Sequence, residues 1–177
     1  MLLVLKFGGT SVGSAQRIKE LVKLTVDETP KIVVLSAMSG TTNCLVEICN
    51  SLYIKNVDQA ADQINKLKQT YLAVINELFA KETTLMKAKN LIDNHFAYIT
   101  AFTLDMFTAN EEKAILAQGE LLSTALFHYY LEEIKVDSVL LPALNFMRID
   151  EDDEPNLTYI EKYIFEELKK HTKSKLF

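Results

Sequence analysis

Glycine and proline are scarce in this chain of 177 residues, which contains 5 and 3 of them respectively. Collagen-like, linker-like and turn-dense all-β sequences are rich in one or both of these residues. Their scarcity excludes those classes and favours a helix-rich α/β protein. The length fits one globular domain or slightly more.

Cysteine is equally scarce, since the chain has only Cys44 and Cys49 and lacks both a CxxC motif and clustered histidines. This pattern supports neither a disulfide framework nor a zinc site. We expect both cysteines to be small packing residues on a helix.

Long apolar runs and excess positive charge are also missing. The longest strongly apolar run, Ile32–Met38, is far shorter than the roughly 20 residues of a membrane-spanning helix. The N-terminus has no basic region or cleavage site typical of a secretory signal, so we expect a cytoplasmic protein without a membrane partner. A net charge of -5 offers no basic surface to phosphate backbones, which makes a small molecule a better expected partner than nucleic acid.

Hydrophobic patterning predicts an alternation of strands and helices in the first part of the chain. Strands are expected at Leu2–Phe7 and Ile32–Leu35, with a helix over 14–28 between them, capped by Ser14, and another helix starting near Cys44. Strands joined by a crossover helix pair in parallel, and ligands then lie beyond their carboxyl ends.

The rest of the chain is predicted to be mainly helical. An antiparallel helical pair is expected within 57–108, broken by a polar segment in which Thr83 or Thr84 caps the second helix. Further elements are expected as a helix over 111–134, a strand at Ser138–Leu141, a solvated acidic loop at Asp150–Glu154 and an amphipathic helix over 157–170.

A glycine-rich segment follows the first predicted strand and fits a phosphate. It runs from Lys6 to Ser14 and leads into a helix N-terminus. Glycines let backbone N–H groups approach phosphate oxygens, and the helix dipole attracts negative charge. The segment is not a Walker A motif, because Ser14-Ala15 stand where Lys-Ser/Thr would be. A tight turn carrying an exposed lysine is the alternative.

A second polar loop, Ser36–Asn43, follows the second predicted strand and is expected at the same edge of the sheet. Its hydroxyls and amide can bind a polar small molecule, although Thr42 or Asn43 can also serve simply as a helix cap. Arg148 is expected at this edge as a further contributor.

The third candidate is Gln118-Gly119-Glu120, inside an otherwise apolar helical stretch. A helical glycine costs roughly 1 kcal/mol relative to alanine, which implies a packing or functional reason. Apolar residues flank Glu120, and a buried carboxylate needs a partner such as a ligand amino group. The alternative is an exposed helix glutamate.

Three motifs together resemble aspartokinases, of the amino acid kinase superfamily. They are KFGGTSV at Lys6–Val12, SAMSGTTN at Ser36–Asn43 and QGELLS at Gln118–Ser123. The resemblance implies an α/β fold with three αβα layers and a mainly parallel sheet, into which the long helical pair is inserted. It also implies phosphoryl transfer from MgATP to the side-chain carboxylate of L-aspartate, the first step of lysine, threonine and methionine synthesis.

The resemblance also implies roles for individual residues. ATP phosphates would be contacted by Lys6, Phe7, Gly8 and Gly9, with Lys6 also catalytic, and L-aspartate by Ser36, Thr42 and Glu120. No protein ligand for a metal is implied, because Mg²⁺ would be held through ATP phosphates and water. An ionised carboxylate needs no general base, so the three histidines, His95 among them, are expected to be incidental.

Aspartokinase catalytic domains continue with a second half that contributes most of the nucleotide site, and they usually carry regulatory ACT domains. Residues 1–177 are therefore expected to be the N-terminal portion of a single, truncated amino acid kinase domain, weakly active or inactive alone. An uncovered sheet edge and an apolar sheet face are expected, and with them either self-association into a homo-oligomer or partial disorder. Two alternatives are a non-catalytic amino-acid-binding or assembly module and a kinase acting on another amino acid.

Overall fold

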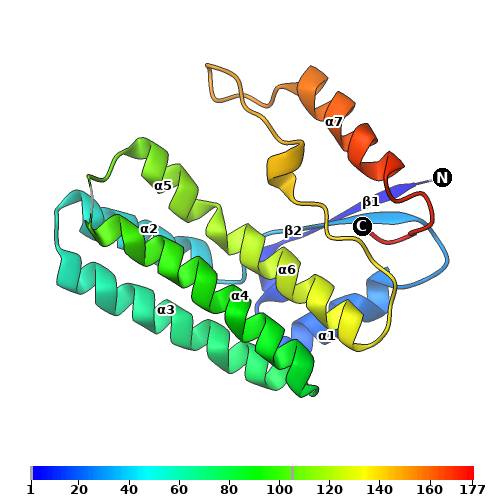
Figure 1. The fold of residues 1–177 in the computed structure, drawn as a ribbon, viewed down its shortest axis with the longest axis horizontal. Helices are drawn as coiled ribbons and strands as arrows, with labels where there is room; N and C mark the ends of the chain where they lie inside the picture. The colour runs from blue at the N-terminus through cyan, green and yellow to red at the C-terminus, as the bar shows by residue number, and fades with distance from the viewer. Residues whose placement is uncertain (1, 105) are drawn as a thin grey trace.

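The computed structural model describes residues 2–104 and 106–177 and consists mainly of α-helices, with a small sheet toward one end of the molecule (Figure 1). Its elements are β1 (Leu3–Phe7), α1 (Ala15–Thr25), β2 (Lys31–Leu35), α2 (Thr41–Tyr53), α3 (Val57–Leu78), α4 (Glu82–Ala101), α5 (Ala109–Leu116), α6 (Gln118–Glu133) and α7 (Leu157–Lys169), with short 3-10 helices at Gly9–Val12, Phe102–Leu104 and Ala143–Asn145. This confirms the predicted α/β fold.

The two strands pair in parallel, as the crossover helix α1 predicts, with Leu3 opposite Lys31 and Phe7 opposite Leu35. On its other edge, β2 pairs with the end of the chain. The N–H of Val33 donates to the carbonyl of Phe177 at 2.7 Å, and Phe177 donates back to Lys31 at 3.0 Å. The sheet therefore joins the first strand to the last residues of the chain.

One face of this sheet is packed and the other is open. Side chains alternate between the faces along a strand, and Leu5 and Phe7 are half-buried while Val4 is 64% exposed and Val34 is 42% exposed. Helices α1 and α6 lie on one side of the strands and α7 lies on the opposite side (Figure 1). No residue of α7 is buried, so this third layer is thin and leaves the expected apolar face in contact with solvent.

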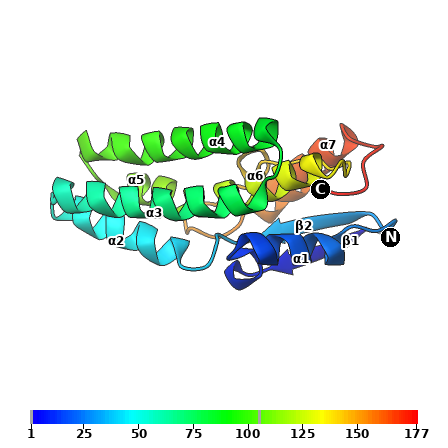
Figure 2. The ribbon, with the colours of Figure 1, turned by 90° about the horizontal axis from the view of Figure 1, so that it is seen from below.

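The predicted antiparallel helical pair is confirmed as α3 and α4, which run side by side along the length of the molecule (Figure 2). Apolar side chains recur every three or four residues in both helices, which puts them on one face of each. The buried side chains of this face are Ala60, Ile64, Leu67, Tyr71, Ile75 and Leu78 in α3, and Ala88, Ile92, Phe96 and Ile99 in α4. Helix α4 ends at Ala101, short of the predicted limit at 108, and Asp105 lies outside the described residues.

Two predictions for the later part of the chain are wrong. The single helix expected over 111–134 is divided at Ala117 into α5 and α6. The segment Ser138–Leu141 is not a strand, although the N–H of Val139 donates to the carbonyl of Leu176 at 2.9 Å. Pro142 follows this segment and has no N–H with which to extend a ladder.

Some helix boundaries also differ from the prediction. Ser14 does cap α1, since its side chain accepts a hydrogen bond from the N–H of Arg17. Helix α2 begins three residues before Cys44, because Gly40 adopts a left-handed conformation with φ of 83° and starts the helix without a side-chain cap. The predicted cap of α4 by Thr83 or Thr84 is wrong: Lys81 occupies the cap position without a side-chain cap, and the carboxylate of Glu133 accepts from the N–H groups of Ala80 and Lys81 just before the helix.

Candidate functional site

The carboxyl ends of β1 and β2 lie side by side, and the two polar loops that follow them are hydrogen-bonded to each other. The N–H of Ser36 donates to the carbonyl of Phe7, and the N–H of Ser39 donates to the carbonyl of Gly9, both at 3.1 Å. The sequence prediction that both loops share one edge of the sheet is therefore confirmed.

Glycine is required at one position of the first loop and not at its neighbour. A Cβ atom on Gly9 would lie 2.6 Å from the carbonyl oxygen of Ala37, whereas a Cβ on Gly8 would have no atom within 4 Å. Gly9 thus lets the two loops approach closely, and Gly8 leaves open space above the loop. Backbone at such a position is accessible to an anion.

Lys6 is exposed and lies one residue before Phe7, on the open face of the sheet opposite Val34. It has no ion-pair partner among residues 2–104 and 106–177. An unpaired ammonium group beside the two loops is available to a ligand of negative charge.

Glu120 lies in the first turn of α6 and contacts the second loop. Its Oε1 atom accepts a hydrogen bond from the N–H of Ala37 at 3.2 Å. The expectation of a buried carboxylate is wrong, because Glu120 is exposed while the preceding residues Gln118 and Gly119 are buried. The side chain faces the loop from the surface of the helix, where solvent or a ligand reaches it.

Close packing explains why a glycine stands at position 119 inside a helix. A Cβ atom there would lie 2.6 Å from Cβ of Ala37 and 3.1 Å from Cγ2 of Thr41. The missing side chain lets the loop after β2 pack directly on α6. Helix α6 begins at Gln118, immediately before this contact, which is where the predicted single helix is interrupted.

Ser36 and Thr42 stand at the two ends of the second loop. Ser36 is half-buried, and its carbonyl accepts a hydrogen bond from Oγ of Ser123 at 2.8 Å. Thr42 is exposed in the first turn of α2. The alternative that Thr42 or Asn43 caps this helix is wrong, because Gly40 occupies the cap position. The hydroxyl of Thr42 is therefore not committed to a cap.

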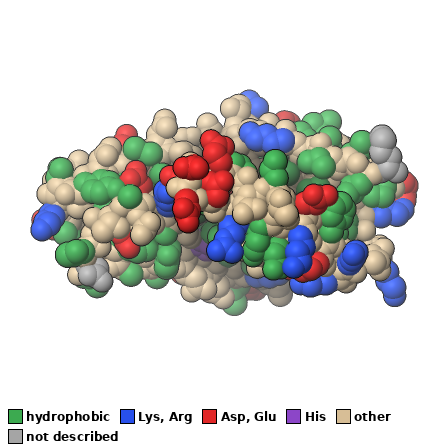
Figure 3. All heavy atoms as spheres, turned by 90° about the horizontal axis from the view of Figure 1, so that it is seen from above, with side chains coloured by type: hydrophobic (Ala, Val, Ile, Leu, Met, Phe, Trp, Pro, Cys, Tyr) green, Lys and Arg blue, Asp and Glu red, His purple; other side chains and the backbone are tan. Residues whose placement is uncertain are grey.

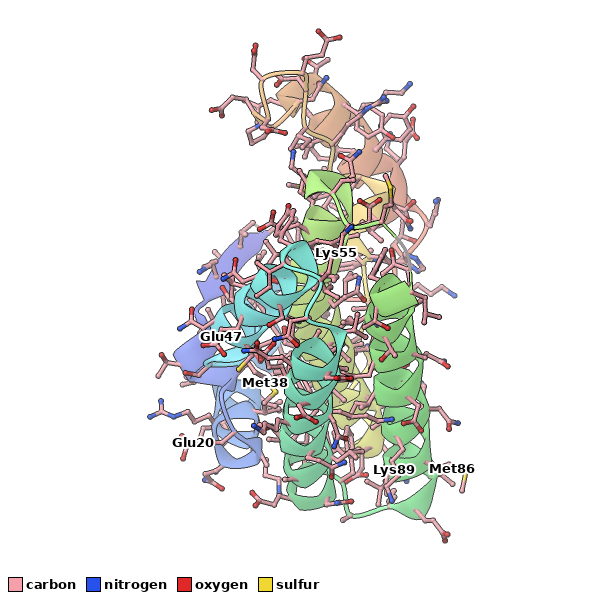
Figure 4. The ribbon with its side chains drawn as sticks, turned by 90° about the vertical axis from the view of Figure 1, so that its left-hand side faces the viewer. Glu20, Met38, Glu47, Lys55, Met86 and Lys89 are labelled. Carbon is pink, nitrogen blue, oxygen red and sulfur yellow. The ribbon has the colours of Figure 1, made fainter. Side chains whose placement is uncertain are left out.

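Sequence analysis missed two polar contacts from the helical pair. The hydroxyls of Tyr71 and Thr41 share a buried hydrogen bond of 3.1 Å, and burial raises the pKa of Tyr71 to about 12. Nδ1 of His95 lies 2.6 Å from Oε1 of Gln118, so His95 is not incidental to the structure. The sequence contains only a weak signal for these contacts, which is that Tyr71 and His95 carry polar atoms within or beside the apolar positions of their helices. Met38 is buried, whereas Met86 projects from the outer side of α4 (Figure 4).

The acidic turn before α7 is separate from the loops. Figure 3 shows acidic side chains gathered on the face from which the turn 150–154 projects. The guanidinium carbon of Arg148 lies 5.3 Å from the centroid of the Tyr159 ring, so Arg148 stacks on that ring instead of contributing to the two polar loops. Within the described ranges, no group of three or more His, Cys, Asp or Glu side chains is placed to hold a metal ion, and no helix is long and apolar enough to cross a membrane.

Comparison with known sequences gives consistent matches. A family model described as the amino acid kinase family matches residues 1–174. Aspartokinase 2, chloroplastic, of Arabidopsis thaliana is 33% identical over 164 residues, covering 89% of this chain and 29% of that protein. The aspartokinase of Rickettsia conorii is 34% identical over 137 residues, covering 74% of this chain and 32% of that protein. The chain thus spans about a third of the length of these relatives.

The fold of this chain also matches solved structures. The structure of E. coli aspartokinase III in complex with aspartate and ADP has a TM-score of 0.79, and the complex of the same enzyme with lysine and aspartate has a TM-score of 0.82. Each is 22% identical and covers 99% of this chain and 40% of the solved chain. The aspartate kinase of Clostridium acetobutylicum matches with a TM-score of 0.64.

Proposed function

The chain belongs to the amino acid kinase family, and from the arrangement of its loops we propose that it forms the aspartate- and phosphate-contacting part of an aspartate kinase. The observation that carries the proposal is the hydrogen bond between Glu120 and the N–H of Ala37. It holds a carboxylate beside the two polar loops at the carboxyl ends of the strands. That is where ligands bind in parallel α/β sheets.

In the proposed reaction, a side-chain carboxylate oxygen of L-aspartate attacks the γ-phosphorus of ATP. The bond from phosphorus to the β,γ-bridging oxygen breaks, and ADP leaves. Lys6 neutralises charge on the transferred phosphoryl group, and the segment Phe7–Gly9 presents its backbone to the phosphates. No base is needed, because the attacking carboxylate is ionised near neutral pH. Mg²⁺, when bound, shields the phosphate charges and is held by phosphate oxygens and water.

The proposed aspartate site uses the second loop and α6. Glu120 binds the α-amino group of the substrate, because a carboxylate at the helix surface pairs well with an ammonium group. Ser36 and Thr42 orient the substrate with hydrogen bonds. The exposure of Glu120 and the uncommitted hydroxyl of Thr42 support these roles.

We also propose that residues 1–177 form the N-terminal portion of one amino acid kinase domain. The 29% to 32% coverage of the curated relatives supports this, and so does the open sheet face that carries Val4 and Val34. An apolar surface of this kind favours association, so the chain is proposed to form homo-oligomers.

The test is an assay in which hydroxylamine traps aspartyl phosphate, run with ATP, magnesium and L-aspartate. The variants are Lys6→Ala and the matched control Lys89→Ala, which removes another exposed lysine, located on α4 (Figure 4). We expect low turnover that Lys6→Ala abolishes and Lys89→Ala preserves. Turnover that survives in Lys6→Ala contradicts the role of Lys6. A wild-type chain with neither turnover nor saturable aspartate binding overturns the proposed function.

A further inference from the structure

Each helix of the α3/α4 pair directs one polar side chain toward the two elements of the proposed aspartate site. Tyr71 of α3 reaches the loop after β2, and His95 of α4 reaches the start of α6. The two helices make other polar contacts with the rest of the protein, such as the bond between Gln63 and Ser51 and the ion pair between Lys87 and Glu132. The contacts of Tyr71 and His95 differ from these because they are made with the loop after β2 and with the start of α6.

The contact from α3 is completely enclosed. Tyr71 and Thr41 are both buried, and their hydroxyls lie 3.1 Å apart. Thr41 is the first residue of α2 and stands between Gly40 and the exposed Thr42. Removing one hydroxyl leaves the other buried without its partner, which costs more than the bond alone contributes. The position of the loop is thus coupled to Tyr71.

The contact from α4 has a defined polarity. Nε2 of Gln118 donates to the carbonyl of Ala114 at 2.8 Å, so the other amide atom, Oε1, accepts from His95. Nδ1 of His95 therefore carries the hydrogen in this arrangement. Gln118 is buried two residues before Glu120, so the bond restrains the turn of α6 from which that carboxylate projects.

These contacts connect the loop after β2, the first turn of α6 and the α3/α4 pair to one another. Tyr71 packs edge-to-face on Phe96, with ring centroids 5.9 Å apart, and Phe96 is the neighbour of His95 in α4. On the other side, the N–H of Ala37 donates to Glu120. The loop and the first turn of α6 are thus fixed to each other directly and, through Tyr71 and His95, to one rigid pair of helices.

We propose that Tyr71 and His95 are positioning residues for the aspartate site, which they hold by fixing Thr41 and Gln118 respectively. The proposal rests on the function proposed above and assigns a role to the helical pair. Neither residue touches the substrate. Their effect is to keep the Glu120 carboxylate and the Thr42 hydroxyl at a constant separation, which lowers the ordering needed when aspartate binds.

The chain offers a matched control for the contact of Tyr71. Ser51 Oγ donates to Oε1 of Gln63 at 2.8 Å, and this bond also joins α2 to α3. Ser51 is as buried as Thr41 but lies 10 residues further along the helix, about 15 Å away at the usual rise. Ser51→Ala therefore removes a similar bond far from the loop.

The first measurement is calorimetric titration of the full chain with L-aspartate, together with urea unfolding. We expect Tyr71→Phe and His95→Ala to weaken aspartate binding by about 5-fold each, the equivalent of one hydrogen bond. Ser51→Ala is expected to lose as much stability as Tyr71→Phe while its affinity stays within about 2-fold of wild type. His95→Asn retains a donor near Nδ1 and is expected to restore most of the affinity.

The second measurement needs no ligand: the hydrogen-exchange rate of the Ala37 amide, which reports its bond to Glu120. We expect faster exchange in Tyr71→Phe and His95→Ala but not in Ser51→Ala. If affinity and exchange in both variants match Ser51→Ala, the positioning role is overturned. If wild type does not bind aspartate, the proposed function fails, and the exchange rates alone then decide whether the helices hold the loop.

Discussion

The carboxylate of Glu120 accepts a hydrogen bond from the backbone N–H of Ala37 at 3.2 Å, although 83 residues separate the two along the chain. The bond joins α6 to the loop that follows β2. Ser123 repeats the connection one turn later, through its bond to the carbonyl of Ser36. The helix and the loop therefore behave as one unit, and a change at their contact is expected to alter the whole site.

Replacing Gly119 with alanine tests that contact. The new Cβ would lie 2.6 Å from Cβ of Ala37, so the loop or the helix must move. Overpacking of this kind costs about 1–3 kcal/mol, and we expect a loss of that size in the free energy of unfolding together with weaker aspartate binding. Urea unfolding and calorimetry measure the two effects.

The control for this substitution is Thr124→Ala in the same helix. Among the residues that the structure describes, the hydroxyl of Thr124 bonds only to carbonyls of its own helix, those of Glu120 and Leu121, so its loss leaves the loop contact intact. A Gly119→Ala protein as stable as this control, with unchanged affinity, would show that the loop does not pack on α6 as closely as described.

The two adjacent glycines of the first loop are expected to respond differently to alanine. Gly9→Ala places a Cβ 2.6 Å from the carbonyl oxygen of Ala37, whereas Gly8→Ala meets nothing within 4 Å. We expect Gly9→Ala to be destabilised by about 1–3 kcal/mol and Gly8→Ala to stay within about 0.5 kcal/mol of wild type. Thermal unfolding of both variants checks this, and equal stability of the two would contradict the close approach of the loops.

Glu133 makes stability depend on pH. Burial by itself would raise the pKa of this carboxyl, but hydrogen bonds from the N–H of Ala80, from Thr84 and from the N–H of Lys81 together hold the pKa below its ordinary value. A carboxyl whose pKa is lowered by folding stabilises the folded state above its unfolded pKa and loses that effect as pH falls through the folded pKa.

Glu133→Gln is therefore expected to be about 1–3 kcal/mol less stable than wild type at pH 7, with the difference shrinking below about pH 5. Glu132→Gln, at the exposed neighbouring position, serves as the control and is expected to change stability by less than about 1 kcal/mol. Urea unfolding from pH 3 to 8 gives both curves. A constant difference between Glu133→Gln and wild type across that range would contradict the assigned role.

The two cysteines are expected to differ in reactivity. Cys49 is buried, and burial, assisted by the charge of Glu112, raises its pKa to about 11. Since the thiolate is the reactive form, Cys49 is expected to react with a thiol reagent only after unfolding. The variant Cys44→Ser leaves Cys49 as the single thiol. Rapid labelling of this variant in its native state would show that the core around α2 is more open than described.

Local sequence patterns were sufficient to predict β1, β2, α1 and the α3/α4 pair, because alternation, periodicity and the Ser14 cap are properties of neighbouring residues. Parallel pairing of the two strands then predicted that the two polar loops share one edge of the sheet. The division at Ala117 was not predictable, because it depends on the distant loop that packs against Gly119. The contacts of Tyr71 and His95 were missed for the same reason, since their partners lie 30 and 23 residues away.

The most direct test of the proposed site compares L-aspartate with succinate, which has both carboxylates but no amino group, in wild type and in Glu120→Gln. If Glu120 binds the amino group, wild type prefers aspartate by about 10-fold or more, and Glu120→Gln loses that preference while its affinity for succinate is unchanged. Calorimetric titration of both proteins with both ligands gives the four affinities. An equal preference for aspartate in the two proteins, or no saturable binding of aspartate by wild type, would contradict the account.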